Sequence, residues 1–76
     1  MKVKVYSSPF CFWCNILKNF LKENNIEFED INVQENHEAA VEMIEKSGQT
    51  GVPVIEIDGK IIIGFDEKRI RKALNL

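Results

Sequence analysis

Two cysteines, Cys11 and Cys14, are the residues of this chain whose types and spacing most clearly predict chemistry, and no other cysteine is present. A Cys-x-x-Cys pair that follows a predicted strand and begins a predicted helix is typical of a redox pair. The alternatives are two buried thiols or half of a zinc site. Structural zinc takes four ligands, whereas this chain has no second cysteine pair and only one histidine, His37. The redox interpretation is therefore favoured.

Size and charge exclude several other classes of function. Seventy-six residues predict one domain, residues 1–76. The net charge is −2, and the interspersed acidic and basic residues form neither a basic stripe for nucleic acid nor a polybasic segment for a membrane surface. The chain lacks an apolar run long enough to span a bilayer, and Met1–Tyr6 does not resemble a signal peptide. We therefore expect a cytoplasmic monomer, in which a permanent structural disulfide is disfavoured.

Hydrophobic periodicity predicts the elements that position the cysteines. The predicted strands cover residues 2–6, 28–32, 54–57 and 60–63, and the predicted helices cover residues 12–24, 37–46 and 67–74. Asp58-Gly59 predicts a two-residue hairpin between the last two strands, while a β-α-β unit implies parallel pairing of the first two. The order β-α-β-α-β-β-α thus predicts an α/β fold with a mixed four-stranded sheet flanked by three helices.

Capping and core residues complete this outline. Asn24-Asn25 and Gly48 suit the left-handed conformation at helix ends, and Asn36 and Asp66 suit N-caps. We expect the core to include Tyr6, Ile16, Phe20, Phe28 and Ile44. The basic residues of the last predicted helix are expected on a solvated face.

Three motifs occur in a specific order: Cys11-x-x-Cys14 after the first strand, Val52-Pro53 before the third, and Gly64-Phe65-Asp66 after the fourth. As a set they resemble the glutaredoxin family of the thioredoxin fold, and the resemblance covers essentially the whole chain. The segments 47–55 and 64–66 look most like small bacterial glutaredoxin-like proteins, which lie close to the redoxins that donate electrons to ribonucleotide reductase. The resemblance implies a dithiol thiol–disulfide oxidoreductase with no bound cofactor.

The place of each cysteine predicts its role. Cys11 begins a helix, where free backbone N–H groups favour a thiolate over the thiol form, whose ordinary pKa is about 8.5. We therefore expect Cys11 to be the nucleophile that attacks a disulfide. Cys14 lies one turn later and is expected to resolve the mixed disulfide on Cys11.

The resemblance also implies a set of substrate-binding residues. Val52 and a cis Pro53 would present the Val52 backbone to a peptide or to glutathione. Gly64, Phe65 and Asp66 would hold the γ-glutamyl end of glutathione, although Asp66 has a competing role as an N-cap. Further candidate contacts are Phe12, Trp13, Gln49 and Thr50, and Trp13 could equally pack over the start of the helix.

Some positions depart from the family's usual pattern. Phe12 stands where proline is more common, Ser7-Ser8 lies where many members have a lysine, and Gly51 replaces the usual threonine. The residues between the cysteines affect the geometry of the helix start and hence the redox potential. The Ser7-Ser8 and Gly51 departures bear on glutathione binding rather than on dithiol exchange. Two reductants therefore remain candidates: glutathione as co-substrate, or a thioredoxin-reductase-like flavoprotein. The expected partners are disulfide-containing proteins.

Two non-enzymatic alternatives remain. Some glutaredoxins bridge an iron–sulfur cluster between two subunits through the first cysteine and glutathione, but such carriers often have a single cysteine, and this chain has two. A structural metal-binding domain is the other alternative, and it predicts unfolding by a chelator. We expect no metal site.

Overall fold

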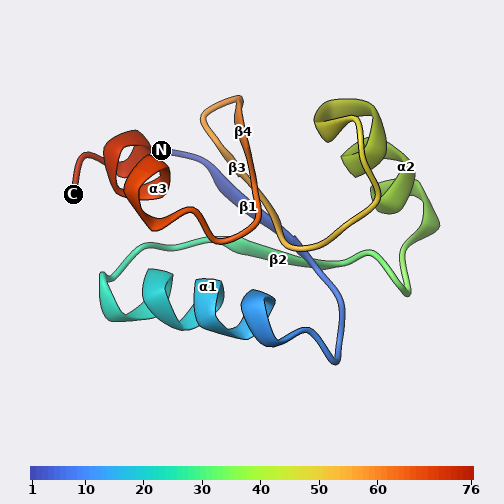
Figure 1. Ribbon diagram of the computed structural model, residues 1–76, viewed down its shortest axis with the longest axis horizontal. Helices are drawn as coiled ribbons and strands as arrows, with labels where there is room; N and C mark the ends of the chain where they lie inside the picture. The colour runs from blue at the N-terminus through green and yellow to red at the C-terminus, as the bar shows by residue number, and fades with distance from the viewer.

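The computed structural model describes all 76 residues and contains seven elements in the predicted order (Figure 1). The strands are β1 (Val3–Ser7), β2 (Glu29–Asn32), β3 (Val54–Ile57) and β4 (Lys60–Ile63), and the helices are α1 (Phe12–Glu23), α2 (His37–Ser47) and α3 (Glu67–Leu74). The predicted elements are confirmed, and their ends differ from the predicted ones by at most one residue.

The four strands form one mixed sheet in the order β2-β1-β3-β4. β1 pairs with β2 in parallel, whereas β3 is antiparallel to both β1 and β4. The Asp58-Gly59 hairpin that links β3 to β4 has positive φ angles of 48° and 89°, as a type I′ turn requires. The α/β fold predicted from the order of the elements is therefore confirmed.

Side chains of successive strand residues point to opposite sides of the sheet, so both faces carry apolar side chains. Helices cover both of these faces. One core cluster joins Val5 of β1 to side chains of α1 and α3, including Leu17 and Ile70. A smaller cluster on the opposite face joins Tyr6 to Met43 of α2 and to Val54. The cysteine-bearing helix and α3 therefore share one face, and α2 covers the other (Figure 1).

The predicted core is only partly correct. Tyr6 is fully buried, and Ile16, Phe20 and Phe28 are half-buried. The prediction for Ile44 is wrong, because its side chain is 40% exposed. α2 packs on the sheet through Ala39 and Met43, which are four residues apart, and Ile44 follows Met43 about 100° further round the helix.

The predicted caps are confirmed and explain where the helices begin and end. Asn36 accepts a hydrogen bond from Ala39 N, and α2 ends at Gly48 with φ of 73°. Asn25, with φ of 58°, follows α1.

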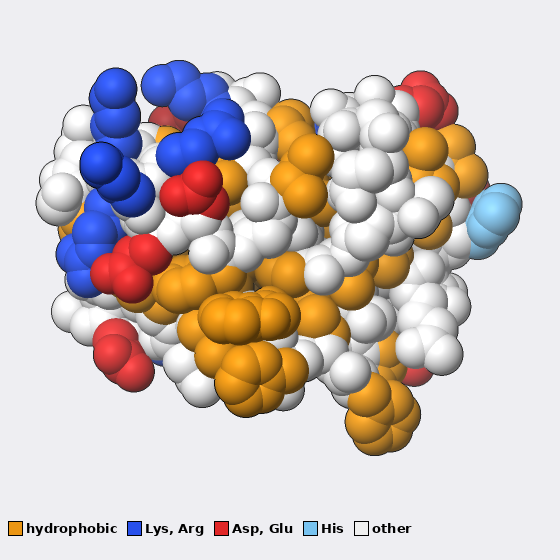
Figure 2. Space-filling model, in the orientation of Figure 1, with side chains coloured by type: hydrophobic (Ala, Val, Ile, Leu, Met, Phe, Trp, Pro, Cys, Tyr) orange, Lys and Arg blue, Asp and Glu red, His pale blue; other side chains and the backbone are white.

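None of the helices is both long and apolar enough to cross a membrane. Lys and Arg side chains gather over α3 as a solvated face (Figure 2).

Strand pairing brings the three motifs to one edge of the sheet. Tyr6, near the end of β1, pairs with Val54 at the start of β3, and Val54 pairs with Ile63 at the end of β4. The chain just after β1, just before β3 and just after β4 must therefore meet at this edge. These segments carry the Cys-x-x-Cys, Val52-Pro53 and Gly64-Phe65-Asp66 motifs, respectively.

Candidate active site

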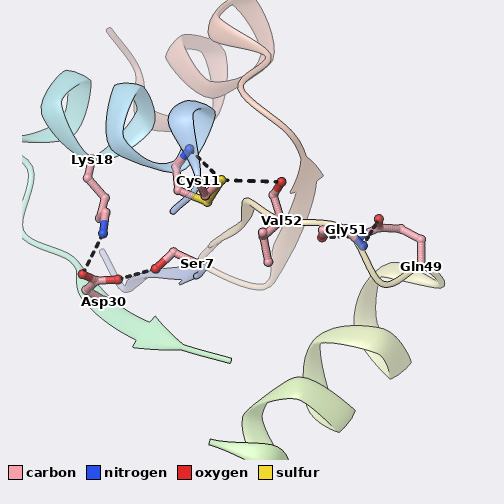
Figure 3. Close-up of a disulfide and its surroundings, with 8 residues drawn as sticks. Ser7, Cys11, Lys18, Asp30, Gln49, Gly51 and Val52 are labelled. Carbon is pink, nitrogen blue, oxygen red and sulfur yellow. Dashed lines mark hydrogen bonds and ion pairs between the residues drawn. A yellow bond between two sulfur atoms is a disulfide. The ribbon is translucent and has the colours of Figure 1, made fainter. Parts of the chain in front are cut away.

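Cys11 and Cys14 form a disulfide at the start of α1, with their Cα atoms 5.2 Å apart. Cys11 is the N-cap of the helix, and its backbone is extended. The N–H of Cys14 points at the Sγ of Cys11 over 3.2 Å (Figure 3). The first turn of α1 thus directs a backbone donor and the positive end of the helix dipole at the Cys11 sulfur.

The two cysteines differ sharply in exposure. Cys14 is fully buried, whereas Cys11 is partly exposed. Because an incoming disulfide must reach the attacking sulfur, only Cys11 is open to a substrate in this arrangement. Cys14 can be reached by the Cys11 sulfur from within the protein.

The Val52–Pro53 segment faces the disulfide, and its peptide bond is cis. The carbonyl oxygen of Val52 lies 4.0 Å from the Sγ of Cys11 (Figure 3). Since a disulfide sulfur carries no hydrogen, this is a contact in the oxidised protein and would become a weak hydrogen bond from a thiol. Pro53 is buried, and its carbonyl accepts a hydrogen bond from Gly64 N over 2.8 Å, which ties this segment to the end of β4.

A shallow cleft of about 280 Å³ lies beside the disulfide. It is lined by Trp13, Val52, Pro53, Gly64 and Phe65. The rings of Trp13 and Phe65 stack with their centroids 6.4 Å apart. The structure thus brings together five of the predicted site residues, and no Lys or Arg lines this cleft. A larger cleft, of about 860 Å³, is lined by residues of α1, β2 and the loop between them and contains neither cysteine.

Gln49, Thr50 and Asp66, also predicted to contact substrate, do not line the cleft. The Gln49 amide is hydrogen-bonded to Ser47, the last residue of α2, and to Gly51 in the loop that follows. Thr50 is exposed. The Asp66 carboxylate caps α3 by accepting from Arg69 N over 3.3 Å, so one of its oxygens has a structural role.

Three aromatic side chains around the cysteines are exposed to solvent. Phe10 is fully exposed, Phe12 is 69% exposed and Trp13 is 55% exposed. Hydrophobic side chains accordingly project over the start of α1 and the loop before it (Figure 2). We call Phe10, Phe12 and Trp13 the exposed aromatic surface. Phe10 was not predicted as a site residue, although an apolar residue in a turn beside a nucleophile is a signal that could have identified it.

A polar cluster lies near the end of β1 and was not predicted from the sequence. The buried Ser7 donates to the Asp30 carboxylate over 2.8 Å, and Lys18 pairs with the other Asp30 oxygen at 3.1 Å (Figure 3). This cluster joins β1, β2 and α1 just below the cysteines. No sequence motif marks it, since it depends on the register of the parallel strands.

The pKa shifts occur away from the disulfide, on the α2 face. Hydrogen bonds from Lys46 and Tyr6 lower the pKa of Glu42. The hydrogen bonds that Lys46 donates to the carboxylates of Glu42 and Glu56 raise the pKa of Lys46. Burial, followed by the Glu42 hydrogen bond, raises the pKa of Tyr6. These contacts join α2 to β1 through Tyr6 and to β3 through Glu56. No group of three or more His, Cys, Asp or Glu side chains is arranged to hold a metal ion.

Comparison with known proteins agrees with this geometry. The glutaredoxin family model matches residues 3–62. An uncharacterized glutaredoxin-like 8.6 kDa protein in the rubredoxin operon of Clostridium pasteurianum is 47% identical over 72 residues, covering 95% of this chain and 96% of that protein. The glutaredoxin-like protein NrdH of Lactococcus lactis is 36% identical over 70 residues, covering 92% and 96%. The solved structure of NrdH-redoxin from Escherichia coli superposes with a TM-score of 0.83 at 26% identity, covering 95% and 93%.

The matched segment contains both cysteines and the Val52-Pro53 pair, and the relatives extend over nearly the whole chain. The fold is that of the thioredoxin-like glutaredoxins. On these grounds the chain belongs to the glutaredoxin family of thiol–disulfide oxidoreductases, with Cys11 and Cys14 as its redox-active pair.

Proposed function

We propose that this protein reduces protein disulfides and glutathione mixed disulfides by dithiol exchange, with Cys11 as nucleophile and Cys14 as resolving cysteine. The observation that carries the assignment is the contrast between the partly exposed Cys11, which receives the Cys14 N–H at 3.2 Å, and the fully buried Cys14. A backbone donor directed at a sulfur stabilises the thiolate, and the thiolate is the form that attacks.

The exchange proceeds in two substitutions at sulfur. The Cys11 thiolate attacks one sulfur of the target disulfide, so that a Cys11 mixed disulfide forms and the other target sulfur leaves as a thiolate. Cys14 then loses its proton and attacks the Cys11 sulfur. The Cys11–Cys14 disulfide forms, and the second target sulfur leaves. Two electrons have passed to the target, whose thiolates take up protons from solvent.

The backbone of Val52 is the proposed contact for the chain that carries the target sulfur. Its N–H has no hydrogen-bond partner within the protein, and its carbonyl contacts only the Cys11 sulfur. An extended peptide could pair with both groups as an added strand would. The adjacent cleft between Trp13 and Phe65 could then receive a neighbouring side chain or the γ-glutamyl group of glutathione.

A thioredoxin-reductase-like flavoprotein is the reductant that the surface supports best. The exposed aromatic surface consists of residues that flank Cys11 in the chain, and exposed aromatic side chains are typical anchors of protein interfaces. The cleft offers no cation for the carboxylates of glutathione. The Escherichia coli NrdH-redoxin is described as having a thioredoxin-like activity profile. Glutathione is the second candidate, which Gly64 and Phe65 in the cleft support.

We further propose that the protein acts as a monomer in the cytoplasm. A ribonucleotide reductase is one candidate acceptor, in keeping with the relative named NrdH. The oxidised protein, offered reduced glutathione or NADPH with thioredoxin reductase, should be reduced faster by the flavoprotein. The fluorescence of Trp13, the only tryptophan, reports the reaction.

Serine variants test the two roles separately. Incubated with a protein disulfide, Cys14→Ser should accumulate a mixed disulfide on Cys11, visible as an added mass. Cys11→Ser should accumulate none. A mixed disulfide on Cys14 in the Cys11→Ser variant, formed at the same rate, would reverse the assignment.

A further inference from the structure

The side chain of Gln49 binds the backbone of the loop that precedes Pro53. Its Oε1 accepts from Gly51 N over 2.6 Å, and its Nε2 donates to Gly51 O over 3.0 Å (Figure 3). Nε2 also lies 3.1 Å from the Oγ of Ser47, which in turn donates to Met43 O over 2.7 Å. One carboxamide therefore pairs with both polar groups of Gly51 and links them to the last turn of α2.

Val52 is placed between two fixed neighbours as a result. Gly51 is held on one side by Gln49, and Pro53 is held on the other by the hydrogen bond from Gly64 N over 2.8 Å. Of these three residues, only Val52 has neither backbone group hydrogen-bonded to the rest of the chain, apart from the 4.0 Å contact of its carbonyl with Cys11. The carbonyl of Val52 points toward the disulfide (Figure 3).

Gln49 and Gly51 also depend on each other sterically. A Cβ added at Gly51 would lie 2.8 Å from the Oε1 of Gln49, which is closer than a real Cβ contact. Apart from Gly51 and its two chain neighbours, no residue other than Gln49 has an atom within 4 Å of that position. A side chain at position 51 can therefore be accommodated only if the Gln49 carboxamide, which holds Gly51, moves.

We propose that Gln49, acting through Gly51, is a positioning residue that fixes the Val52 backbone for substrates that carry a peptide backbone beside the disulfide. The assignment rests on the proposed function, because it deepens the proposed role of Val52. Gln49 lowers the entropy cost of binding by ordering the loop in advance. It does not contact the reacting sulfurs. A small disulfide without a peptide backbone gains nothing from it.

Single-turnover kinetics test this assignment. The reduced protein is mixed with either a peptide disulfide or bis(2-hydroxyethyl) disulfide, and Trp13 fluorescence gives the half-saturating concentration and the limiting rate. For Gln49→Ala with the peptide, the half-saturating concentration should rise roughly tenfold, the factor that about 1.4 kcal/mol represents. The limiting rate, and the second-order rate with the small disulfide, should be unchanged. Gln34→Ala, which alters the only other glutamine, is the matched control and should behave as the unmodified protein.

A double-mutant cycle tests the coupling through Gly51. Gly51→Ala should displace the carboxamide and raise the half-saturating concentration about as much as Gln49→Ala does. Because both changes break the same contact, the double variant should be no worse than either single variant. Additive effects would overturn the proposal.

The remaining outcomes separate this proposal from the proposed function. An unchanged half-saturating concentration in Gln49→Ala would overturn the positioning role while leaving dithiol exchange intact. An equal loss of rate with the peptide disulfide and the small disulfide would also overturn the positioning role, since the substitution would then affect the reaction at the sulfurs. If the unmodified protein reduced neither disulfide, the proposed function would fail, and the role of Gln49 would fail with it.

Discussion

The edge of the sheet that carries the disulfide and the face covered by α2 use their polar and apolar groups in opposite ways. On the α2 face, Lys46 lies 2.7 Å from both Glu42 and Glu56, and Tyr6 donates to Glu42 over 3.0 Å. At the disulfide edge, the backbone of Val52 lacks such partners, and the exposed aromatic surface faces solvent.

This difference separates stability from function. Paired charges on the α2 face satisfy one another, so that face makes its contacts within the chain. Groups left without partners at the disulfide edge gain theirs only when another molecule binds. Changes at the disulfide edge should therefore lower activity with little loss of stability, and changes on the α2 face should do the reverse.

The largest expected effect is at Cys11. Cys11→Ser should reduce disulfide reduction to background, because the hydroxyl is not a nucleophile toward disulfides at neutral pH. Cys14→Ser should keep the first exchange and accumulate the mixed disulfide. Steady-state reduction of insulin measures the loss, and full activity in Cys11→Ser would disprove the assigned nucleophile.

The exposed aromatic surface gives the next largest effect. Trp13→Ala should raise the KM for a protein partner about tenfold, as is typical of removing an aromatic anchor from an interface. Because Trp13 is 55% exposed, the free energy of unfolding should change little. Ile44→Ala is the matched control, since Ile44 is an exposed apolar residue on α2. An equal change in KM for both variants would remove the special role of the disulfide edge.

Substitutions of Asp66 test whether a residue at the disulfide edge contributes to stability. Asp66→Ala should lower the free energy of unfolding by about 1 kcal/mol, because it removes the N-cap of α3. Asp66→Asn keeps a capping oxygen and should be nearly as stable as the unmodified protein. Urea denaturation measures both, and Asn36→Ala provides an N-cap control on α2.

The same pair of variants shows whether Asp66 contacts glutathione. If Asp66 acts only as a cap, Asp66→Asn should reduce glutathione mixed disulfides with an unchanged KM. A raised KM in Asp66→Asn, without a loss of stability, would instead show that its charge contacts the ammonium group.

The smallest expected effect is the pH dependence contributed by the α2 face. Because the pKa of Glu42 is lowered in the folded protein, Glu42 stabilises the fold above its unfolded pKa, and this contribution is lost as the pH falls through the folded value. Glu42→Gln should therefore be less stable than the unmodified protein at pH 7, and the difference should shrink toward pH ~3. Urea denaturation at both pH values measures this. Glu45→Gln on the same helix is the control, and an equal dependence in both variants would contradict the assigned ion pairs.

Features of the fold that depend on residues close together in the sequence could be predicted. Asp58-Gly59, Asn36 and Gly48 act on their own backbone or on residues within one turn, and the hairpin and both ends of α2 were predicted from them correctly. The convergence of the cysteine and Val52-Pro53 motifs could also be predicted, but only from the resemblance of an ordered set of motifs.

Features that depend on side-chain packing could not be predicted. Ile44 is exposed because Ala39 and Met43 determine which side of α2 faces the sheet. The hydrogen bonds of the Gln49 amide to Gly51 depend on the loop conformation, which no local sequence signal specifies. The pairing of Lys18 with Asp30 likewise requires the parallel register of β1 and β2.

The asymmetry between the two cysteines is the central claim, and alkylation of the reduced protein tests it most directly. Brief exposure to iodoacetamide at pH 7, followed by mass spectrometry of the digested protein, gives the rate at each cysteine. Cys11 should be alkylated at least about tenfold faster than Cys14, because it is the accessible sulfur and receives a backbone N–H. Equal rates, or faster alkylation of Cys14, would contradict the account.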